Sequence, residues 1–317
     1  MTTTVRRERS PLPQLTDRVF LTDGGIETTL IYHQGQDLPE FAAFVLLEDE
    51  LGREQLRHYY RPYLDLARRS GTGLVLETAT WRASHDWGGV LGYSPAALAA
   101  INRAAVELLE QLRPEYATPA APVVISGCIG PRGDGYAPES LMGADEAQEY
   151  HDAQVGTFAQ TAAELVTAIT MTHTSEAIGV VRAATANGME SVISFTVETD
   201  GRLPSGETLE EAVLVTDEAT DGAPAYYMVN CAHPTHVAGT LVSGRPWNER
   251  VRGFRGNAST MSHEELDAAK SLDIGDIEDF GFRYAALHEA LPQLTVLGGC
   301  CGTDERHIAA VRRAVSG

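Results

Sequence analysis

The middle of the chain reads ELVTAIT (Glu164–Thr170), then IGVVRAATA (Ile178–Ala186), then SVISFTV (Ser191–Val197). The two outer runs are short, apolar and rich in β-branched residues, as buried strands are. The run between them has the length and apolar spacing of a helix. A strand, a helix and a second strand in such close succession predict a βαβ unit with two parallel strands.

This alternation extends over the whole chain. Longer segments with helical spacing separate the apolar runs, and the clearest are Arg53–Ser70, Ser94–Leu112 and Ala144–Glu164. Two helix starts carry a capping box, TLEE at Thr208–Glu211 and SHEE at Ser262–Glu265. Six further runs complete a set of eight predicted strands: RVFLTDGG, GLVLETAT, PVVISGCIG, AYYMVNC, VRGFRGN and LTVLGGCC.

Eight strands that alternate with helices in about 300 residues predict an α/β fold of the single (β/α)8 type, a TIM barrel. A doubly wound open sheet is the alternative. Its Gly-rich phosphate-binding fingerprint is missing after the first predicted strand. We expect residues 16–317 to form the barrel, and residues 1–15, which are charged and lack an apolar signal core, to form a flexible N-terminal tail.

Composition limits the partners of this protein. No apolar run approaches the roughly 18 residues that a membrane span needs, so we expect a cytoplasmic protein. The 317 residues carry a formal net charge of -20, and the arginines are scattered among acids. Nucleic acids and anionic membranes are bound through clustered cations, so neither is an expected partner.

Unusual residues gather where the predicted strands end. In a (β/α)8 barrel, catalytic groups lie at the carboxyl ends of the strands. The ends carry Asp23, Gly24 and Gly25 after the first strand, Glu77 and Thr78 after the second, Asn230 and Cys231 after the sixth, and Cys300 and Cys301 after the eighth. Strands six and eight are one strand apart around the ring, so Cys231, Cys300 and Cys301 are predicted to converge.

Three thiolates with an open fourth position suit a catalytic zinc site, because soft sulfur selects Zn²⁺ and a substrate atom can complete the tetrahedron. Neighbouring glycines would let two successive side chains reach one ion. Two other interpretations stay open: a buried Cys231 with incidental neighbours, and a disulfide between Cys300 and Cys301. Cys128 is expected to be a packed thiol, since a fourth thiolate would close the site.

Four motifs together carry a family resemblance. The chain resembles the homocysteine S-methyltransferases in LTDGGIETTL near its start, in GCIGPRGDGY, in VNC and in GGCCGT, which occur in that order between about Phe20 and Ile308. The resemblance implies a zinc-dependent thiol methyltransferase with Cys231, Cys300 and Cys301 as ligands. It also implies that the turn of Asp23, Gly24 and Gly25 contacts the acceptor through backbone groups. No catalytic side chain beyond the metal site is expected.

The resemblance further implies that homocysteine is the acceptor and that methionine is the product. The partners are then a small thiol and a methyl donor, with a homo-oligomer as an open alternative to a monomer. Asp23, Gly24, Gly25, Glu77, Thr78 and Asn230 are the expected substrate-binding residues. The chain has no room for a folate or cobalamin module, which favours S-methylmethionine, S-adenosylmethionine or a betaine-like compound as a cationic donor. Trp81, Tyr32 and Tyr136 near the mouth would face its charge.

Two strand ends depart from the family. Relatives often read DLLALETMP in the fourth strand, with a glutamate that pairs with the acceptor's amino group, and here Ile169 stands in its place. Relatives often carry TNTYQAS in the second strand, where this chain has TATWRAS preceded by Glu77. Either Glu77 now meets the ammonium group of homocysteine, or the acceptor is a different small thiol. A barrel that senses metal or redox state without turnover is a further alternative.

Overall fold

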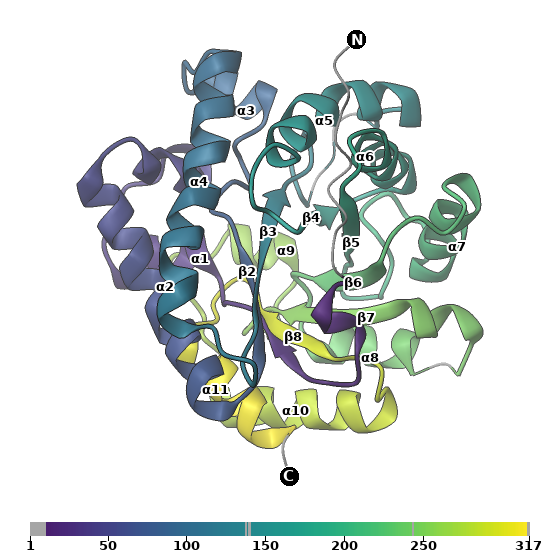
Figure 1. Cartoon of the computed structure of the whole chain (residues 1–317). Coiled ribbons are helices and arrows are strands. Elements are labelled where there is room, and N and C mark those ends of the chain that lie inside the picture. The colour runs from purple at the N-terminus through teal and green to yellow at the C-terminus, as the bar shows by residue number, and fades with distance from the viewer. Residues whose placement is uncertain (1–10, 137, 139–140, 243, 316–317) are drawn as a thin grey trace.

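The computed structural model describes residues 11–136, 138, 141–242 and 244–315. Eight parallel strands follow one another around a closed barrel, and β1 pairs with β8 to close it (Figure 1). This confirms the predicted (β/α)8 barrel and excludes the open sheet. The strands are β1 (Phe20–Leu21), β2 (Gly73–Glu77), β3 (Val123–Ile129), β4 (Leu165–Met171), β5 (Glu190–Thr196), β6 (Tyr226–Asn230), β7 (Val251–Gly256) and β8 (Val296–Gly299).

Helices surround the barrel, and both predicted capping boxes are formed, at Thr208 and at Ser262. The α-helices are α1 (Ile26–Thr28), α2 (Glu50–Ser70), α3 (His85–Val90), α4 (Pro95–Tyr116), α5 (Ala144–Phe158), α6 (Thr174–Ala186), α7 (Leu209–Ala219), α8 (Pro234–Leu241), α9 (His263–Asp267), α10 (Ile277–Ala290) and α11 (Glu305–Ala314). Short 3-10 or π turns are η1 (Pro13–Leu15), η2 (Thr29–His33), η3 (Pro39–Phe41), η4 (Ala43–Leu47) and η5 (Pro246–Arg250). None of the helices in the described ranges combines the length and the apolar character that crossing a membrane requires.

One helix is shorter than its pattern indicated. We predicted a helix over Ala144–Glu164, but α5 ends at Phe158. Glu164 instead leads into β4, where its carboxylate accepts hydrogen bonds from the Ile125 backbone N–H at 2.8 Å and from Arg113 at 2.5 Å. These contacts with β3 and α4 are remote in sequence, so local spacing could not show them.

The inside of the barrel is layered by the two-residue period of its strands. A lower apolar layer contains Phe20, Val75, Val124, Leu165, Val192, Tyr226 and Val296. Two residues further along several of these strands the buried side chains become polar, as in Glu77, Ser126, Thr167 and Ser194. Ser126 and Thr167 are joined by a hydrogen bond of 2.7 Å. The lower apolar layer therefore supports a polar layer at the carboxyl ends of the strands.

Part of the predicted N-terminal tail packs against the lower apolar layer of the barrel. Residues 1–10 lie outside the described residues, but Leu12 and Gln14 are buried. Leu12 belongs to the apolar cluster at the bottom of the barrel. The flexible tail expected for residues 1–15 therefore does not extend to η1, because an apolar side chain at position 12 gains burial there.

A glycine in α6 allows the closest helix contact, and its replacement tests the packing. A Cβ at Gly179 would lie 2.4 Å from the Ala147 Cβ and 2.6 Å from the Gln148 N of α5. Gly179→Ala should lower the free energy of unfolding by about 1 to 3 kcal/mol through overpacking. Gly239→Ala is the matched control, since nothing lies within 4 Å of that Cβ in α8. It should be neutral or stabilising by up to about 1 kcal/mol. Urea unfolding midpoints compare the two, and equal midpoints would contradict the packing argument.

Candidate metal centre

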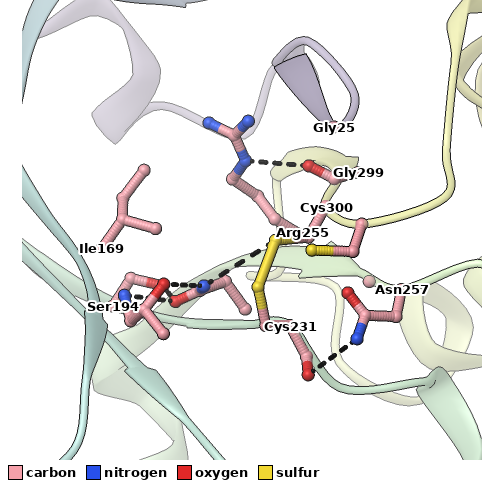
Figure 2. Close-up of a disulfide and its surroundings, with 12 residues drawn as sticks. Gly25, Ile169, Ser194, Cys231, Arg255, Asn257, Gly299 and Cys300 are labelled. Carbon is pink, nitrogen blue, oxygen red and sulfur yellow. Dashed lines mark hydrogen bonds between the residues drawn. A yellow bond between two sulfur atoms is a disulfide. The ribbon is translucent and has the colours of Figure 1, made fainter. Parts of the chain in front are cut away.

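Three cysteine side chains meet at the carboxyl end of the barrel. The Sγ atoms of Cys231, Cys300 and Cys301 all lie within 4.8 Å of one another. Cys231 follows β6 and the other two follow β8, so the predicted convergence of these strand ends is confirmed. Cys231 and Cys300 are joined by a disulfide and Cys301 is free (Figure 2). A disulfide between the adjacent residues Cys300 and Cys301 is not formed.

The backbone of Cys231 is held from several directions. Its φ angle of 54° lies in the left-handed region, which is uncommon for a residue with a side chain. Its N–H donates to the Arg255 carbonyl at 3.1 Å. Its carbonyl accepts from Asn257 Nδ2 at 3.0 Å (Figure 2). The same carbonyl accepts from His263 Nε2 at 2.6 Å. The other ring nitrogen of His263 lies 2.8 Å from Glu198 Oε1. These contacts fix the direction of the Cys231 side chain.

The glycines around the cysteine turn mainly allow neighbouring segments of the chain to approach one another closely. A Cβ at Gly298 would lie 1.8 Å from Thr22 Oγ1, and one at Gly299 would lie 2.0 Å from Thr303 Oγ1. A Cβ at Gly25 would lie 2.6 Å from the Cys300 carbonyl oxygen. The loop after β1 therefore packs directly on the turn that carries the cysteines. The tight bend that we expected of these glycines falls on Gly302, whose φ is 77°.

Tyr136, from the loop after β3, reaches the sulfur atoms. Its hydroxyl donates to Cys231 Sγ at 3.3 Å and lies 3.7 Å from Cys301 Sγ. The ring packs against that of His263, with 4.3 Å between the ring centroids. The loop after β3 therefore closes one side of the cysteine cluster.

The reduced form of the cluster fits a soft divalent cation. Thiolates bind zinc, and three of them leave a fourth position for a substrate. Burial raises the pKa of Cys301 to about 11, so this thiol stays protonated at neutral pH unless a cation lies beside it. Among the described residues, no His, Asp, Glu or further Cys joins the three sulfurs as a possible ligand. Cys128 is a separate buried thiol, and burial followed by the charge of Glu77 raises its pKa.

A cavity of about 250 Å³ opens beside the sulfur atoms. The expected substrate-binding residues Asp23, Gly24, Gly25, Glu77 and Thr78 all line it, as do the three cysteines. The mouth aromatics Tyr32, Trp81 and Tyr136 line it as well. One expected backbone donor is already used, because the Gly25 N–H donates to the Thr303 carbonyl at 3.0 Å.

An ion pair forms the floor of the cavity. Arg255 Nη2 lies 2.6 Å from Asp23 Oδ1, and both side chains are almost fully buried. Arg255 Nε also donates to the Gly299 carbonyl at 3.0 Å (Figure 2), and Tyr59 donates to Asp23 Oδ2 at 2.9 Å. Burial raises the pKa of Asp23, although Arg255 and Tyr59 oppose that shift. Arg255 Nη1 is buried without a hydrogen-bond partner.

Glu77 lies on the same floor. Its side chain is 4% exposed, and its Oε2 is buried without a hydrogen-bond partner. Burial raises the pKa of Glu77 to about 7, while the charge of Arg255 opposes the shift. Ile169, which replaces the usual glutamate of the family, also lines the cavity. The floor thus presents one acidic and one basic group, each with an unpaired atom.

Asn230 has a different place from the one that we expected. It does not line the cavity, and its side chain is completely buried. Its Oδ1 accepts from the Thr170 N–H at 2.9 Å and from Ser194 Oγ at 2.7 Å (Figure 2). Its Nδ2 lies 4.0 Å from Cys300 Sγ. Asn230 therefore joins β4 and β5 to the cysteine cluster instead of facing a substrate.

Several charged residues of the cavity escaped the sequence analysis, among them Glu27, Arg82 and Arg255. Arg255 and Arg82 follow the strand-end rule, since they lie in VRGFRGN and in TATWRAS. An arginine among apolar residues at the end of a predicted strand could have been predicted to line the site. Glu27 lies in α1, and its direction depends on a turn that no pattern fixes. Burial raises the pKa of Glu27 to about 7.

Comparisons with known proteins agree with this geometry. The family model described as homocysteine S-methyltransferase matches residues 20–315. The solved structure of the homocysteine methyltransferase MmuM from Escherichia coli in its metallated form is 21% identical, with a TM-score of 0.72 over 94% of this chain and 96% of that chain. Its oxidised form is 21% identical with a TM-score of 0.70, and its apo form is 19% identical with a TM-score of 0.66. Both match over the same shares of the two chains. Among curated proteins, none matches this chain.

Metal content tests the centre directly. The reduced protein should bind about one zinc ion per chain, and oxidation should release it, since sulfurs in a disulfide are not thiolate ligands. Cys300→Ser and Cys301→Ser should each lose most of the zinc, because serine offers no thiolate. Cys128→Ala is the matched control and should keep it. Zinc is measured by inductively coupled plasma mass spectrometry after reduction and gel filtration, and full retention in both serine variants would overturn the site.

Proposed function

The chain belongs to the homocysteine S-methyltransferase family, and on that premise we propose that it is a zinc-dependent S-methyltransferase. It moves a methyl group from a cationic donor to the thiol of a small acceptor, with homocysteine as acceptor and methionine as product. The observation that carries the proposal is the convergence of three cysteine sulfurs at the wall of a cavity, on strand ends of a (β/α)8 barrel. Cys231, Cys300 and Cys301 would hold the zinc ion.

A free thiol is a poor nucleophile at pH 7, because its ordinary pKa is near 8.5. When bound, zinc supplies a deprotonated acceptor thiol without a general base. The protein's own residues then have to orient the acceptor and exclude water. The buried floor of Asp23, Arg255 and Glu77 can do so from below, while Tyr136 closes the cluster from the side.

The floor matches the two charges of an amino acid. Glu77 Oε2 and Arg255 Nη1 are both buried without a partner. An ammonium group beside Glu77 and a carboxylate beside Arg255 would satisfy both atoms, and buried charges are costly when they stay unpaired. This arrangement supports homocysteine as acceptor in spite of Ile169. Glu77 then replaces the glutamate that relatives carry on the fourth strand.

The mouth of the cavity favours a cationic donor. Acidic residues line it, and so do the aromatic side chains of Tyr32, Phe41, Trp81 and Tyr136. Aromatic faces attract sulfonium and quaternary ammonium groups. Besides Asp23 and Glu77, the acids among the lining residues are Glu27, Asp134, Asp267 and Asp273. S-methylmethionine, S-adenosylmethionine and betaine-like compounds share the required positive charge next to the methyl group.

A second function has one observation in its favour. The disulfide between Cys231 and Cys300 would suit a redox or metal sensor without turnover. Two features favour the enzyme. The described residues supply three ligands and not four, which leaves an open coordination position, and a charged cavity adjoins that position. A sensor with a structural zinc needs neither.

Methyl transfer itself is the first test. Reduced, zinc-loaded protein should convert homocysteine to methionine with at least one donor of the panel S-methylmethionine, S-adenosylmethionine and glycine betaine. A deuterated methyl group on the donor should appear in the product by mass spectrometry. Cys301→Ser protein serves as the control and should form none. Stoichiometric zinc binding with no transfer to any thiol would favour the sensor.

Glu77→Gln tests how the acceptor is held. Removing the carboxylate should weaken the binding of homocysteine in the transition state by about 2 to 5 kcal/mol. This loss lowers kcat/KM for homocysteine by about thirtyfold or more. The acceptor 4-mercaptobutyrate, which lacks only the amino group, should be affected much less. The assay is run at pH 8, because the raised pKa of about 7 leaves Glu77 ionised only above that value. Equal losses on both thiols would rule out ammonium recognition by Glu77.

A further inference from the structure

Glu27 and Arg82 are two of the charged residues that line the cavity, and Arg82 has no part in the reaction as described so far. Glu27 lies in α1, just after the end of β1, and Arg82 lies in the loop after β2. Both line the same cavity as the cysteines. They lie close enough for each charge to act on the other, yet no ion pair joins them among the described residues.

Glu27 is placed beside the cysteine turn. The Gly25 N–H donates to the Thr303 carbonyl at 3.0 Å, and the Gly302 N–H donates to Thr28 Oγ1 at 3.2 Å. Residues on both sides of Glu27 are therefore tied to the turn that carries Cys300 and Cys301. The Glu27 side chain is half-buried, so it stays accessible from the cavity. Burial raises the pKa of Glu27, while its own backbone and the charges of Arg82 and Arg255 oppose the shift.

Arg82 is held rigidly but is only partly satisfied. Its guanidinium lies 4.1 Å from the ring centroid of Trp81 and 3.7 Å from that of Trp87. Nη1 donates to the Gly133 carbonyl at 3.3 Å, whereas Nε is buried without a hydrogen-bond partner. The side chain is 7% exposed. A flat guanidinium that is stacked and has free N–H groups is well suited to bind a carboxylate.

We infer that Glu27 and Arg82 form the donor subsite and select a zwitterionic methyl donor, which carries a carboxylate as well as its methylated sulfonium or ammonium centre. This inference rests on the proposed methyl transfer. Arg82 binds the carboxylate, and Glu27 faces the cationic centre. The acceptor uses the opposite charges of Glu77 and Arg255 on the floor, so the donor approaches the cysteine cluster from the mouth, where Tyr32 and Phe41 are half-exposed.

The charge change in the reaction fits this placement. The bond between the methyl carbon and the donor heteroatom breaks, and its electron pair stays on that atom, which becomes neutral. The acceptor sulfur supplies the pair for the new S–CH₃ bond, and its thiol proton passes to solvent. A sulfonium donor leaves a neutral thioether, which keeps its carboxylate but loses the positive charge that faced Glu27. Attraction to Glu27 therefore holds the donor and not the product, which favours product release.

The test compares donors with and without a carboxylate on reduced, zinc-loaded enzyme. S-methylmethionine and dimethylsulfoniopropionate carry the carboxylate, and trimethylsulfonium does not. Arg82→Met should raise KM for the first two by about ten- to hundredfold and leave that for trimethylsulfonium unchanged. Glu27→Gln should raise KM for all three. Neither variant should change KM for homocysteine.

Two controls separate this subsite from general damage. Arg132→Met removes another arginine that lies near an aromatic ring. Arg132 already pairs with Asp86 and Glu146, and it does not line the cavity. KM for the donors should therefore not change in this variant. Arg82→Lys keeps the charge between the tryptophans and should give an intermediate KM if Arg82→Met fails to fold. Losses by either Arg82 variant that are equal on all three donors would overturn the assignment.

Calorimetric titration keeps this inference distinct from the proposed reaction. S-methylmethionine should bind the wild-type enzyme without acceptor, and its Kd should rise by a similar factor in Arg82→Met. If no donor supports methyl transfer but this binding difference holds, then the proposed function fails and the subsite stands. If transfer occurs and the Kd for S-methylmethionine is the same in both proteins, then the subsite fails and the function stands.

Discussion

The buried ion pair between Asp23 and Arg255 determines how the strand ends are arranged. One guanidinium contacts Asp23 after β1 at 2.6 Å and the Gly299 carbonyl at the end of β8 at 3.0 Å, while it projects from β7. A buried pair is tolerated only when further hydrogen bonds satisfy its atoms, and Tyr59 supplies one to Asp23. Removing either partner would leave an unpaired charge inside the barrel, at a cost of about 3 to 5 kcal/mol. The cysteine turn follows β8 and packs against the loop after β1, so its position depends on this pair.

The same pair explains how the cavity remains charged. Asp23 neutralises only part of Arg255, and Glu77 stands nearby with a pKa of about 7. A second acid and a second arginine, Glu27 and Arg82, repeat this pattern at the mouth. Buried atoms of Glu77, Arg255 and Arg82 lack hydrogen-bond partners, and a ligand that brings both signs of charge would complement them. The cavity lining is acidic like the protein as a whole, but Arg82 and Arg255 place two positive charges within it.

The strand ends were predictable because the buried parallel strands are largely apolar and become polar toward their carboxyl ends. The sulfur cluster followed from that rule and from the order of the strands alone. Glu27 and the place of Asn230 did not follow. The direction of Glu27 is set by two hydrogen bonds with a turn remote in sequence: the Gly25 N–H donates to the Thr303 carbonyl, and Thr28 Oγ1 accepts from the Gly302 N–H. Asn230 is held by Thr170 and Ser194 on neighbouring strands, which only the barrel register brings together.

Ligand convergence has a chemical consequence at this centre. Sulfur atoms close enough to share one ion are also close enough to bond with each other, and here Cys231 and Cys300 do so. The backbone around them is held by contacts that involve no sulfur. His263 and Asn257 hold the Cys231 carbonyl, and the Cys300 N–H donates to the Gly256 carbonyl at 2.8 Å. Because these contacts involve no sulfur, we expect reduction to leave them in place and the freed thiols to stay close to one another.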